Sequence, residues 1–176
     1  MDWNIVSLSA IGRSSSSIRR EPFNSGEPEL DKYLKQYALK NEIINKTFVA
    51  LPSDNPKVIA GYYTCCMSQI NPTGLSQEEQ KRFPRYPIPV MLIGKLAIDK
   101  SFQKMGLGKK LLKHAFESAI TTSDKIGVYA IRVDALHEKA KEYYKKYGFF
   151  ELQDAPLTLI LPLSTIKKAI QIKQKS

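Results

Sequence analysis

The run of residues 90–98 constrains the fold more than any other feature, because it is almost entirely apolar. A strand covered on both faces reads this way, whereas a strand with one solvated face alternates between apolar and polar residues. Residues 127–133 predict a second buried strand. Two such strands need covering layers on both sides. We therefore expect an α/β fold in which helices flank a mixed sheet.

The remaining elements follow from periodicity and turn residues. Helical spacing of apolar side chains predicts helices at 27–41, 105–120 and 137–147. β-Branched and aromatic residues predict further strands at 47–51, 58–68 and 156–163. Asn24 and Ser25 are expected to cap the first helix, and Gly148 to end the third. The proline-rich residues 71–89 are expected to lack regular structure.

Length predicts one domain at residues 1–163, followed by a basic tail at 164–176. The chain begins with no segment of signal-peptide type, and no apolar run reaches membrane-spanning length. Cys65 and Cys66 are adjacent, so on a strand they point to opposite faces and are not expected to form a disulfide. These features predict a cytoplasmic protein without membrane contact. No metal-binding spacing is present, so no metal is expected.

The most informative segment follows the buried strand. A short loop leads into a helix whose first turn holds Gly106 and Gly108. The first amides of a helix have no intrahelical partner and lie at the positive end of the helix dipole. Glycines allow a phosphate to approach the backbone, and Lys104, Lys109 and Lys110 add positive charge. The segment matches neither the dinucleotide fingerprint nor the Walker loop. By itself it fits either an anion site or a helix start with two turn glycines.

The pattern Gln103-x-x-Gly106-x-Gly108 resembles the signature of the GNAT superfamily of N-acetyltransferases. The resemblance implies the GNAT fold and acetyl-coenzyme A as cofactor. It implies that the backbone amides of residues 103–109, hereafter the glycine loop, bind the pyrophosphate. It also implies that the strand residues before the loop hydrogen-bond the pantetheine arm. The cofactor-binding residues expected on this basis are Leu96, Ala97, Ile98, Gln103, Lys104, Met105, Gly106, Leu107, Gly108 and Lys109.

A closer resemblance covers residues 22–163 and is to the TacT-type toxins, GNAT enzymes that acetylate the free amine of aminoacyl-tRNA. It is carried by the segments 24–30, 61–63, 88–90, 94–99, 140–149 and 157–163. It implies aminoacyl-tRNA as acceptor, a ribbon-helix-helix antitoxin as partner, and a homodimer. The chain departs from this pattern at Lys95 and Lys104, where relatives more often carry arginine. Lysine keeps the charge but loses the planar fork of donors.

Amine acetylation requires a neutral amine and a protonated leaving thiolate. An α-amino group titrates near pH ~8, so a strong dedicated base is optional. The family pattern places Tyr144 beside the sulfur, and we expect it to act as the acid. Tyr143 and Tyr147 share another helical face. Asp134 either contacts the pantetheine arm or only ends its strand.

The two histidines and two cysteines are not expected to act in catalysis. His114 is predicted to face solvent, and His137 to be a polar residue of the first helical turn. Cys65 and Cys66 lie in the middle of a predicted strand, and no histidine partner is indicated for either.

The chain has 27 basic and 17 acidic residues and a net charge of +10, which bears on partners and not on fold. If the acceptor is tRNA, lysines and arginines must contact its phosphates. The candidates are Arg82, Arg85, Lys95, Lys145 and Lys146, with Arg19 and Arg20 as further possibilities. Two alternatives remain: a GNAT enzyme for another amine, such as a protein N-terminus or a small molecule, and a non-catalytic module that binds nucleic acid or a partner.

Overall fold

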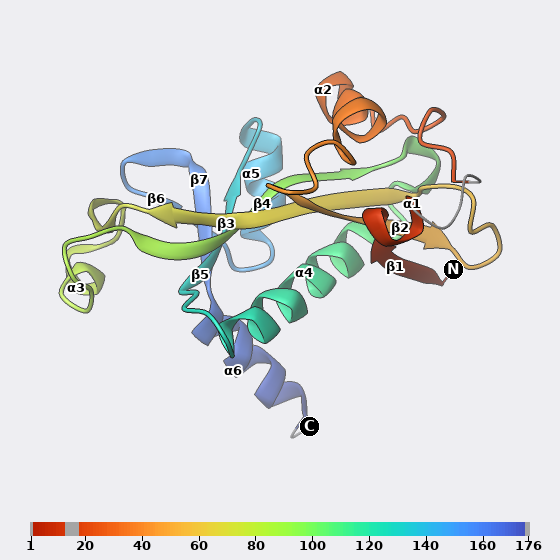
Figure 1. Ribbon diagram of the computed structural model, residues 1–176. Coiled ribbons are helices and arrows are strands. Elements are labelled where there is room, and N and C mark those ends of the chain that lie inside the picture. The colour runs from red at the N-terminus through yellow and green to blue at the C-terminus, as the bar shows by residue number, and fades with distance from the viewer. Residues whose placement is uncertain (1, 13–17, 175–176) are drawn as a thin grey trace. The chain divides into compact units, whose positions relative to one another are not determined.

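The computed structural model describes residues 2–12 and 18–174, with the side chains of 172–174 left aside (Figure 1). Within these residues, seven strands form one mixed sheet in the order β1-β2-β3-β4-β5-β7-β6. β4 and β5 are parallel, while the pairs β1–β2, β2–β3, β5–β7 and β6–β7 are antiparallel. The strands are β1 Trp3–Ser7, β2 Lys46–Pro52, β3 Gly61–Ile70, β4 Ile88–Ile98, β5 Ala130–Asp134, β6 Phe150–Leu152 and β7 Ala155–Pro162.

The helices lie between these strands and after the last of them. The α-helices are α1 Leu8–Gly12, α2 Pro28–Lys32, α3 Gln77–Gln80, α4 Leu107–Ser123, α5 Glu138–Lys145 and α6 Leu163–Gln174. A π-helix, η1 Tyr33–Tyr37, continues α2, and two short 3-10 helices are η2 Pro72–Gly74 and η3 Lys100–Phe102. None of the helices in the described part of the chain combines the length and apolar character needed to cross a bilayer.

The chain divides into two compact units. The first contains residues 1–66 and 94–115, and the second contains residues 67–93 and 116–176. β3, β4 and α4 each pass from one unit into the other. The predicted single domain at 1–163 with a tail at 164–176 stays a prediction.

In the first unit, helices cover both faces of the sheet because successive strand residues point to opposite sides. Tyr62 lies in the core cluster with Leu30 and Leu34, and its hydroxyl donates to the Leu30 carbonyl at 2.7 Å. The next residue, Tyr63, is fully buried and its hydroxyl lies 2.8 Å from His114 Nδ1 on α4. The first unit therefore has the two-sided cover that the apolar run predicted.

The second unit has its own apolar core. Val90 on β4 pairs with Ala130 on β5, and both are fully buried. They pack with residues from β3, β6, β7 and the 71–89 connection. α5 follows β5, and Gly148 ends the turn after it with a φ of 90°. Only glycine adopts that conformation without steric cost, so its predicted role as a helix stop is confirmed.

The predicted fold class is confirmed, and every predicted helix and strand is present with shifted ends. Residues 71–89 are largely irregular as expected, apart from η2, α3 and the start of β4. β1, α1 and β6 were not predicted from the sequence. β1 and β6 are short, with five and three residues, and both lie at sheet edges, where pairing with β2 and β7 stabilises them.

The predicted cap of the first helix is wrong. Glu27 is the N-cap residue of α2, and its side chain makes no capping hydrogen bond. Instead, Asp31 reaches back from within the helix and accepts hydrogen bonds from the Ser25 amide at 2.8 Å and the Ser25 hydroxyl at 2.6 Å. Asn24 Oδ1 accepts from the Gly26 amide, which closes a local turn before the helix. Both predicted residues thus shape the loop before α2 and leave the helix end uncapped.

Candidate functional site

The connection between β4 and α4 begins with a buried carboxylate. Asp99 is 8% exposed, and its two oxygens accept hydrogen bonds from the Ser101 amide at 2.9 Å and the Asn24 amide at 2.8 Å. The first bond caps η3 and the second ties the connection to the segment before α2. Leu96, Ala97 and Ile98 are the last three residues of β4, immediately upstream. The end of β4 and the glycine loop are therefore held at a fixed point of the first unit.

The glycine loop has a left-handed backbone at two positions. Lys104 has a φ of 63° and Gly106 has a φ of 81°. A lysine in this region is strained, and such residues concentrate at functional sites. A Cβ added at Gly106 would meet no atom within 4 Å. The backbone angle at this position therefore favours glycine, and open space lies beside the Gly106 Cα.

The amides that follow belong to the start of α4. The first hydrogen bond of this helix runs from the Lys110 amide to the Gly106 carbonyl at 3.3 Å. The amides of Leu107, Gly108 and Lys109 precede that bond in the first turn, where helix amides have no intrahelical acceptor. Turns that combine left-handed residues with unpaired amides form anion-binding concavities. The geometry therefore fits a phosphate group and argues for the first of the two readings left open by the sequence.

The Gln103 side chain is used by the protein itself. Its Nε2 donates to the Ser25 carbonyl at 2.9 Å and to the Ile98 carbonyl at 3.1 Å. These bonds join the start of the glycine loop to the end of β4 and to the segment before α2. Gln103 can therefore contact an anion through its backbone amide, while its side chain braces the loop.

Exposed side chains surround the glycine loop. Lys104 and Lys109 are exposed, as are Lys100 and Lys110, and Met105 is 49% exposed. Leu107 is buried and anchors the first turn of α4. The loop thus combines an apolar anchor with several ammonium groups in water. This arrangement suits a polyanion that remains partly solvated.

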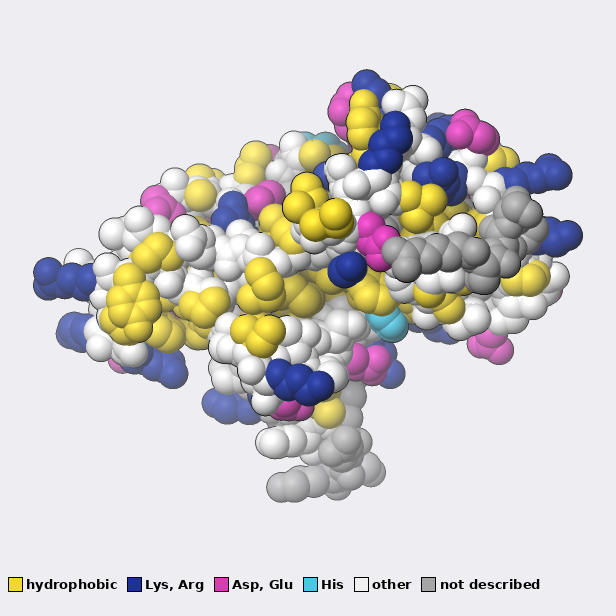
Figure 2. Space-filling view, viewed as in Figure 1, with side chains coloured by type: hydrophobic (Ala, Val, Ile, Leu, Met, Phe, Trp, Pro, Cys, Tyr) yellow, Lys and Arg dark blue, Asp and Glu magenta, His cyan; other side chains and the backbone are white. Residues whose placement is uncertain are grey.

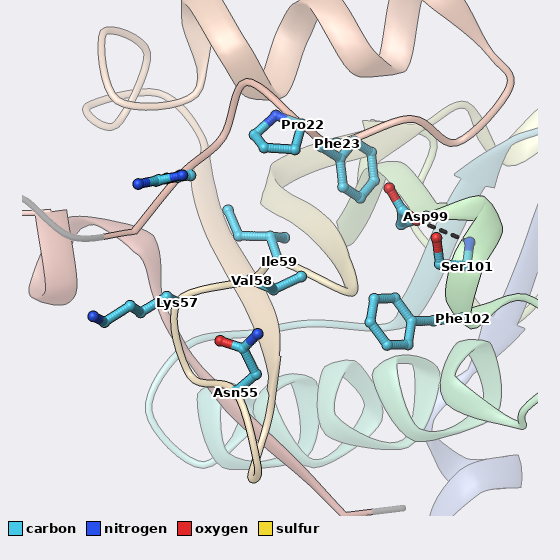
Figure 3. A pocket seen from close by; sticks show the side chains of 10 residues that line it. Pro22, Phe23, Asn55, Lys57, Val58, Ile59, Asp99, Ser101 and Phe102 are labelled. Carbon is cyan, nitrogen blue, oxygen red and sulfur yellow. Dashed lines mark hydrogen bonds between the residues drawn. The ribbon is translucent and has the colours of Figure 1, made fainter.

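An open pocket of about 640 Å³ lies next to this segment within the first unit (Figure 3). Ser101 and Phe102, which directly precede the glycine loop, line one side. Lys57 and Asn55 come from the turn between β2 and β3 and line another. Phe102 packs edge-on against Trp3 with ring centroids 5.4 Å apart, which supports the pocket wall.

Tyr144 lies in the second unit on α5. His137 caps this helix, since its Nδ1 accepts from the Ala140 amide at 3.1 Å, and this agrees with its predicted place in the first turn. Tyr144 is 8% exposed and packs against Tyr143 and Phe149, with centroid distances of 5.5 and 5.6 Å. Burial raises the pKa of Tyr144 to about 12. The hydroxyl is therefore protonated at neutral pH and is able to donate.

Two further tyrosines, Tyr143 and Tyr147, lie near Tyr144, and Tyr143 contacts it. The Tyr143 and Tyr147 rings pack with centroids 5.2 Å apart, which confirms that they share a face. Burial and its hydrogen bond to Tyr147 raise the pKa of Tyr143 further. Both are half-buried, whereas Tyr144 is the buried tyrosine of α5.

Asp134 is the last residue of β5 and is engaged by two neighbours. Arg132 donates to both carboxylate oxygens, at 3.0 and 3.1 Å, and the Thr158 hydroxyl donates at 2.9 Å. These contacts favour a structural role at the strand end. A contact between Asp134 and a pantetheine arm stays a prediction.

The prediction that His114 faces solvent is wrong. Its ring is half-buried, bonded to the Tyr63 hydroxyl and packed against Phe48 at a centroid distance of 5.1 Å. The reason is that this turn of α4 lies against β2 and β3, a tertiary contact that helical spacing alone did not show. Cys65 and Cys66 are free, and burial raises the pKa of both thiols, that of Cys65 to about 11. Neither is poised as a thiolate nucleophile.

The candidate RNA contacts fall into different environments. Arg82 and Arg85 are exposed in the 71–89 connection, with the Arg82 guanidinium 5.9 Å from the Phe83 ring centroid. Lys145 pairs with Glu142 at 3.7 Å, and Lys146 is exposed after it. Lys95 is half-buried, with Nζ 4.3 Å from the Tyr33 ring centroid. In the first unit, acidic and basic side chains lie side by side over α2, which is typical of a solvated face (Figure 2).

Lys141, for which the sequence predicted no role, is buried on α5. Its side chain is 10% exposed and forms an ion pair with Glu151. Lys141 lies three residues before Tyr144, so helical spacing alone would have placed both on one face. Its burial and its partner on β6 could not be read from the spacing.

Comparison with known proteins gives consistent results. A family model described as an acetyltransferase (GNAT) domain matches residues 47–151. A tRNA-acetylating toxin of Mycobacterium tuberculosis is 32% identical over 162 residues, which cover 92% of this chain and 96% of that protein.

Solved structures agree over nearly the whole chain. A tyrosine-to-phenylalanine mutant of KacT superposes with a TM-score of 0.88 at 29% identity, covering 96% of this chain and 99% of the other. AtaT complexed with acetyl-methionyl-tRNAfMet has a TM-score of 0.87 at 28% identity, with the same coverage. AtaTR bound with AcCoA has a TM-score of 0.80 at 28% identity, covering 96% and 98% of the two chains.

Proposed function

We propose that this chain, which belongs to the GNAT acetyltransferase family, transfers the acetyl group of acetyl-coenzyme A to the free α-amine of an aminoacyl-tRNA. Membership of the family makes the chain an acetyl-coenzyme A-dependent acetyltransferase. The choice of acceptor is carried by one observation: the likeness to a tRNA-acetylating toxin extends over 92% of the chain, well beyond the cofactor motif.

The glycine loop supplies the anion contacts. The amides of residues 103–109 bind the pyrophosphate, and the left-handed Lys104 and Gly106 shape the backbone for it. The open space beside Gly106 allows the phosphate to approach. Leu96, Ala97 and Ile98 hydrogen-bond the pantetheine arm from the end of β4. The Gln103 side chain keeps the loop in this conformation through its bonds to Ser25 and Ile98.

Acetyl-coenzyme A supplies a thioester whose carbonyl carbon is attacked by the neutral amine. The amine loses one proton and the departing sulfur gains one. Tyr144 donates a hydrogen bond to the sulfur as negative charge develops there. Its pKa of about 12 lies above that of an ordinary thiol near ~8.5, so the phenol is a weaker acid than the thiol. Tyr144 therefore stabilises the thiolate chiefly as a hydrogen-bond donor. The proton that the amine loses is the one that the sulfur gains.

The basic surface suits an RNA acceptor. A net charge of +10 attracts a polyanion independently of its sequence. Arg82, Arg85, Lys95, Lys145 and Lys146 are the proposed phosphate contacts. The complex of AtaT with acetyl-methionyl-tRNAfMet supports an RNA acceptor of this class.

Regulation by an antitoxin is part of the proposal. One solved neighbour is an AtaT mutant bound to the C-terminus of the antitoxin AtaR, at 25% identity and a TM-score of 0.80. By analogy, a cognate antitoxin neutralises this chain. We propose that this partner is a ribbon-helix-helix protein, that the toxin forms a homodimer, and that it acts in the cytoplasm, where charged tRNA is found.

The test is transfer of radiolabelled acetyl groups from acetyl-coenzyme A onto a total pool of charged tRNA. We expect label on charged tRNA and none on the same pool after deacylation. Tyr144→Phe should lower turnover by roughly 10²–10⁴. Tyr147→Phe, the same chemical change in the turn after α5, serves as the matched control and should remain active.

The alternatives give other results. Acetyl-coenzyme A binding without label on charged tRNA would point to another amine, such as a protein N-terminus or a small molecule. Absence of acetyl-coenzyme A binding would point to a non-catalytic module and would overturn the proposal.

A further inference from the structure

The buried face of α5 is unusual in composition. The two buried residues of this helix are Lys141 and Tyr144. Lysine is almost never buried unless it is paired, and an apolar residue would normally occupy such a position. The helix has eight residues and thus little other buried surface to fix its orientation. These two side chains therefore help to fix the position of α5 in the second unit.

Lys141 is paired across to the edge strand. Its Nζ contacts Glu151 Oε2 on β6, and Glu138 Oε2 lies 3.8 Å away. The hydrogen bond with Glu151 raises the pKa of Lys141, and the carboxylates of Glu138 and Glu142 raise it further. The same hydrogen bond lowers the pKa of Glu151, and the Lys145 ammonium lowers it further. Both groups are therefore charged across the neutral pH range. Loss of one partner leaves the other charge without its main compensation.

The strand that carries Glu151 is itself weakly defined. β6 has three residues, and its pairing with β7 shifts register between Glu151 and Leu152. An ion pair between a short helix and a short edge strand restricts rotation of the helix about its axis. Tyr144 follows Lys141 by three residues on that face, so such a rotation would move its hydroxyl.

Burial raises the pKa of Tyr144. The Tyr144 ring also packs against Phe149, which follows the helix and precedes β6. The ring and the ion pair thus attach α5 to the same short stretch of chain.

We infer that Lys141, through its ion pair with Glu151, is a positioning residue that holds the Tyr144 hydroxyl in its reactive place. The inference rests on the proposed function, in which Tyr144 donates to the departing sulfur. It assigns no catalytic contact to Lys141 or Glu151.

The test compares Lys141→Met, Glu151→Gln and Lys141→Arg. A displacement of about 1 Å at a reacting group costs about 10²-fold in rate. We expect Lys141→Met and Glu151→Gln to lower kcat by up to that factor while KM for acetyl-coenzyme A stays unchanged. Lys141→Arg keeps the charge and should retain most of kcat. Glu151 is 43% exposed in its side chain, so Glu151→Gln provides a test even if Lys141→Met does not fold.

A double-mutant cycle separates positioning from general destabilisation. In a Tyr144→Phe background, Glu151→Gln should cause no further loss of kcat, because the hydroxyl that it positions is already absent. An equal loss in both backgrounds, or a lower Tm with unchanged kcat in the Tyr144 enzyme, would overturn the inference. Full turnover by Tyr144→Phe alone would instead reject the proposed hydrogen bond from Tyr144 to the departing sulfur, a result that the cycle reports separately.

Discussion

Gly106→Ala tests the glycine loop most directly, because the structure separates its two effects. At a φ of 81°, an alanine at position 106 would have a left-handed backbone, which costs about 1–2 kcal/mol for a residue other than glycine. The Cβ itself meets no atom within 4 Å, so no clash adds to this cost. For a chain of 176 residues, about 2–4 °C of Tm corresponds to 1 kcal/mol. The expected decrease in Tm is therefore about 2–8 °C.

The second effect concerns the cofactor. The space beside Gly106 is where the proposed phosphate approaches the backbone, and a methyl group would occupy it. We expect the Kd for acetyl-coenzyme A to rise at least about tenfold, which corresponds to ~1.4 kcal/mol. Titration calorimetry with acetyl-coenzyme A measures this change, and differential scanning calorimetry measures the Tm.

Two other glycines serve as matched controls. Gly148 has a φ of 90°, and its added Cβ would lie 3.6 Å from Leu161 Cδ1, an ordinary contact. Gly148→Ala should therefore lower the Tm by a similar amount while leaving acetyl-coenzyme A affinity unchanged. Gly127 has open space and no left-handed φ, so Gly127→Ala should change neither quantity. If Gly106→Ala bound acetyl-coenzyme A as tightly as Gly148→Ala does, the loop would not be the pyrophosphate site.

Three further outcomes follow from the same contacts. Lys104→Gly removes the strain at a φ of 63° but increases the entropy of the unfolded chain. The free energy of unfolding, measured by chemical denaturation, should therefore rise by about 0.5–1 kcal/mol. A decrease would show that Lys104 is not strained. Gln103→Ala removes two hydrogen bonds to carbonyls and should lower the free energy of unfolding by about 1 kcal/mol while weakening acetyl-coenzyme A binding in calorimetry; unchanged affinity would show that the brace is not needed. The pKa of Glu151 is lowered in the folded state, so its stabilising effect is present above the ordinary carboxylate pKa and is lost as the pH falls through the folded value. The Tm difference between the unmodified protein and Glu151→Gln should thus be present at pH 7, begin to shrink below about pH 4, and vanish once the pH is below the lowered pKa of Glu151. A constant difference would refute the ion pair as its source.

The sequence determined the features that local patterns encode. The apolar run at 90–98 and the spacing of the helices predicted a mixed sheet covered on both faces, and the structure confirms it. The motif around Gly106 predicted an anion site, and its left-handed backbone agrees with that prediction. These features could be read because hydrophobic period, turn glycines and helix starts depend on residues a few positions apart. The residue roles in catalysis and RNA binding stay predictions.

Tertiary structure decided the contacts between residues far apart in the chain. The Gln103 side chain reaches Ser25, 78 positions earlier, and Asp99 reaches Asn24, 75 positions earlier. The half-buried place of His114 depends on β2 and β3, and the burial of Lys141 depends on a carboxylate on β6. From the sequence alone, each of these polar groups could equally well have been exposed to solvent. Folding selects their partners because a buried polar or charged group must be satisfied by whatever the packed chain brings within hydrogen-bonding distance.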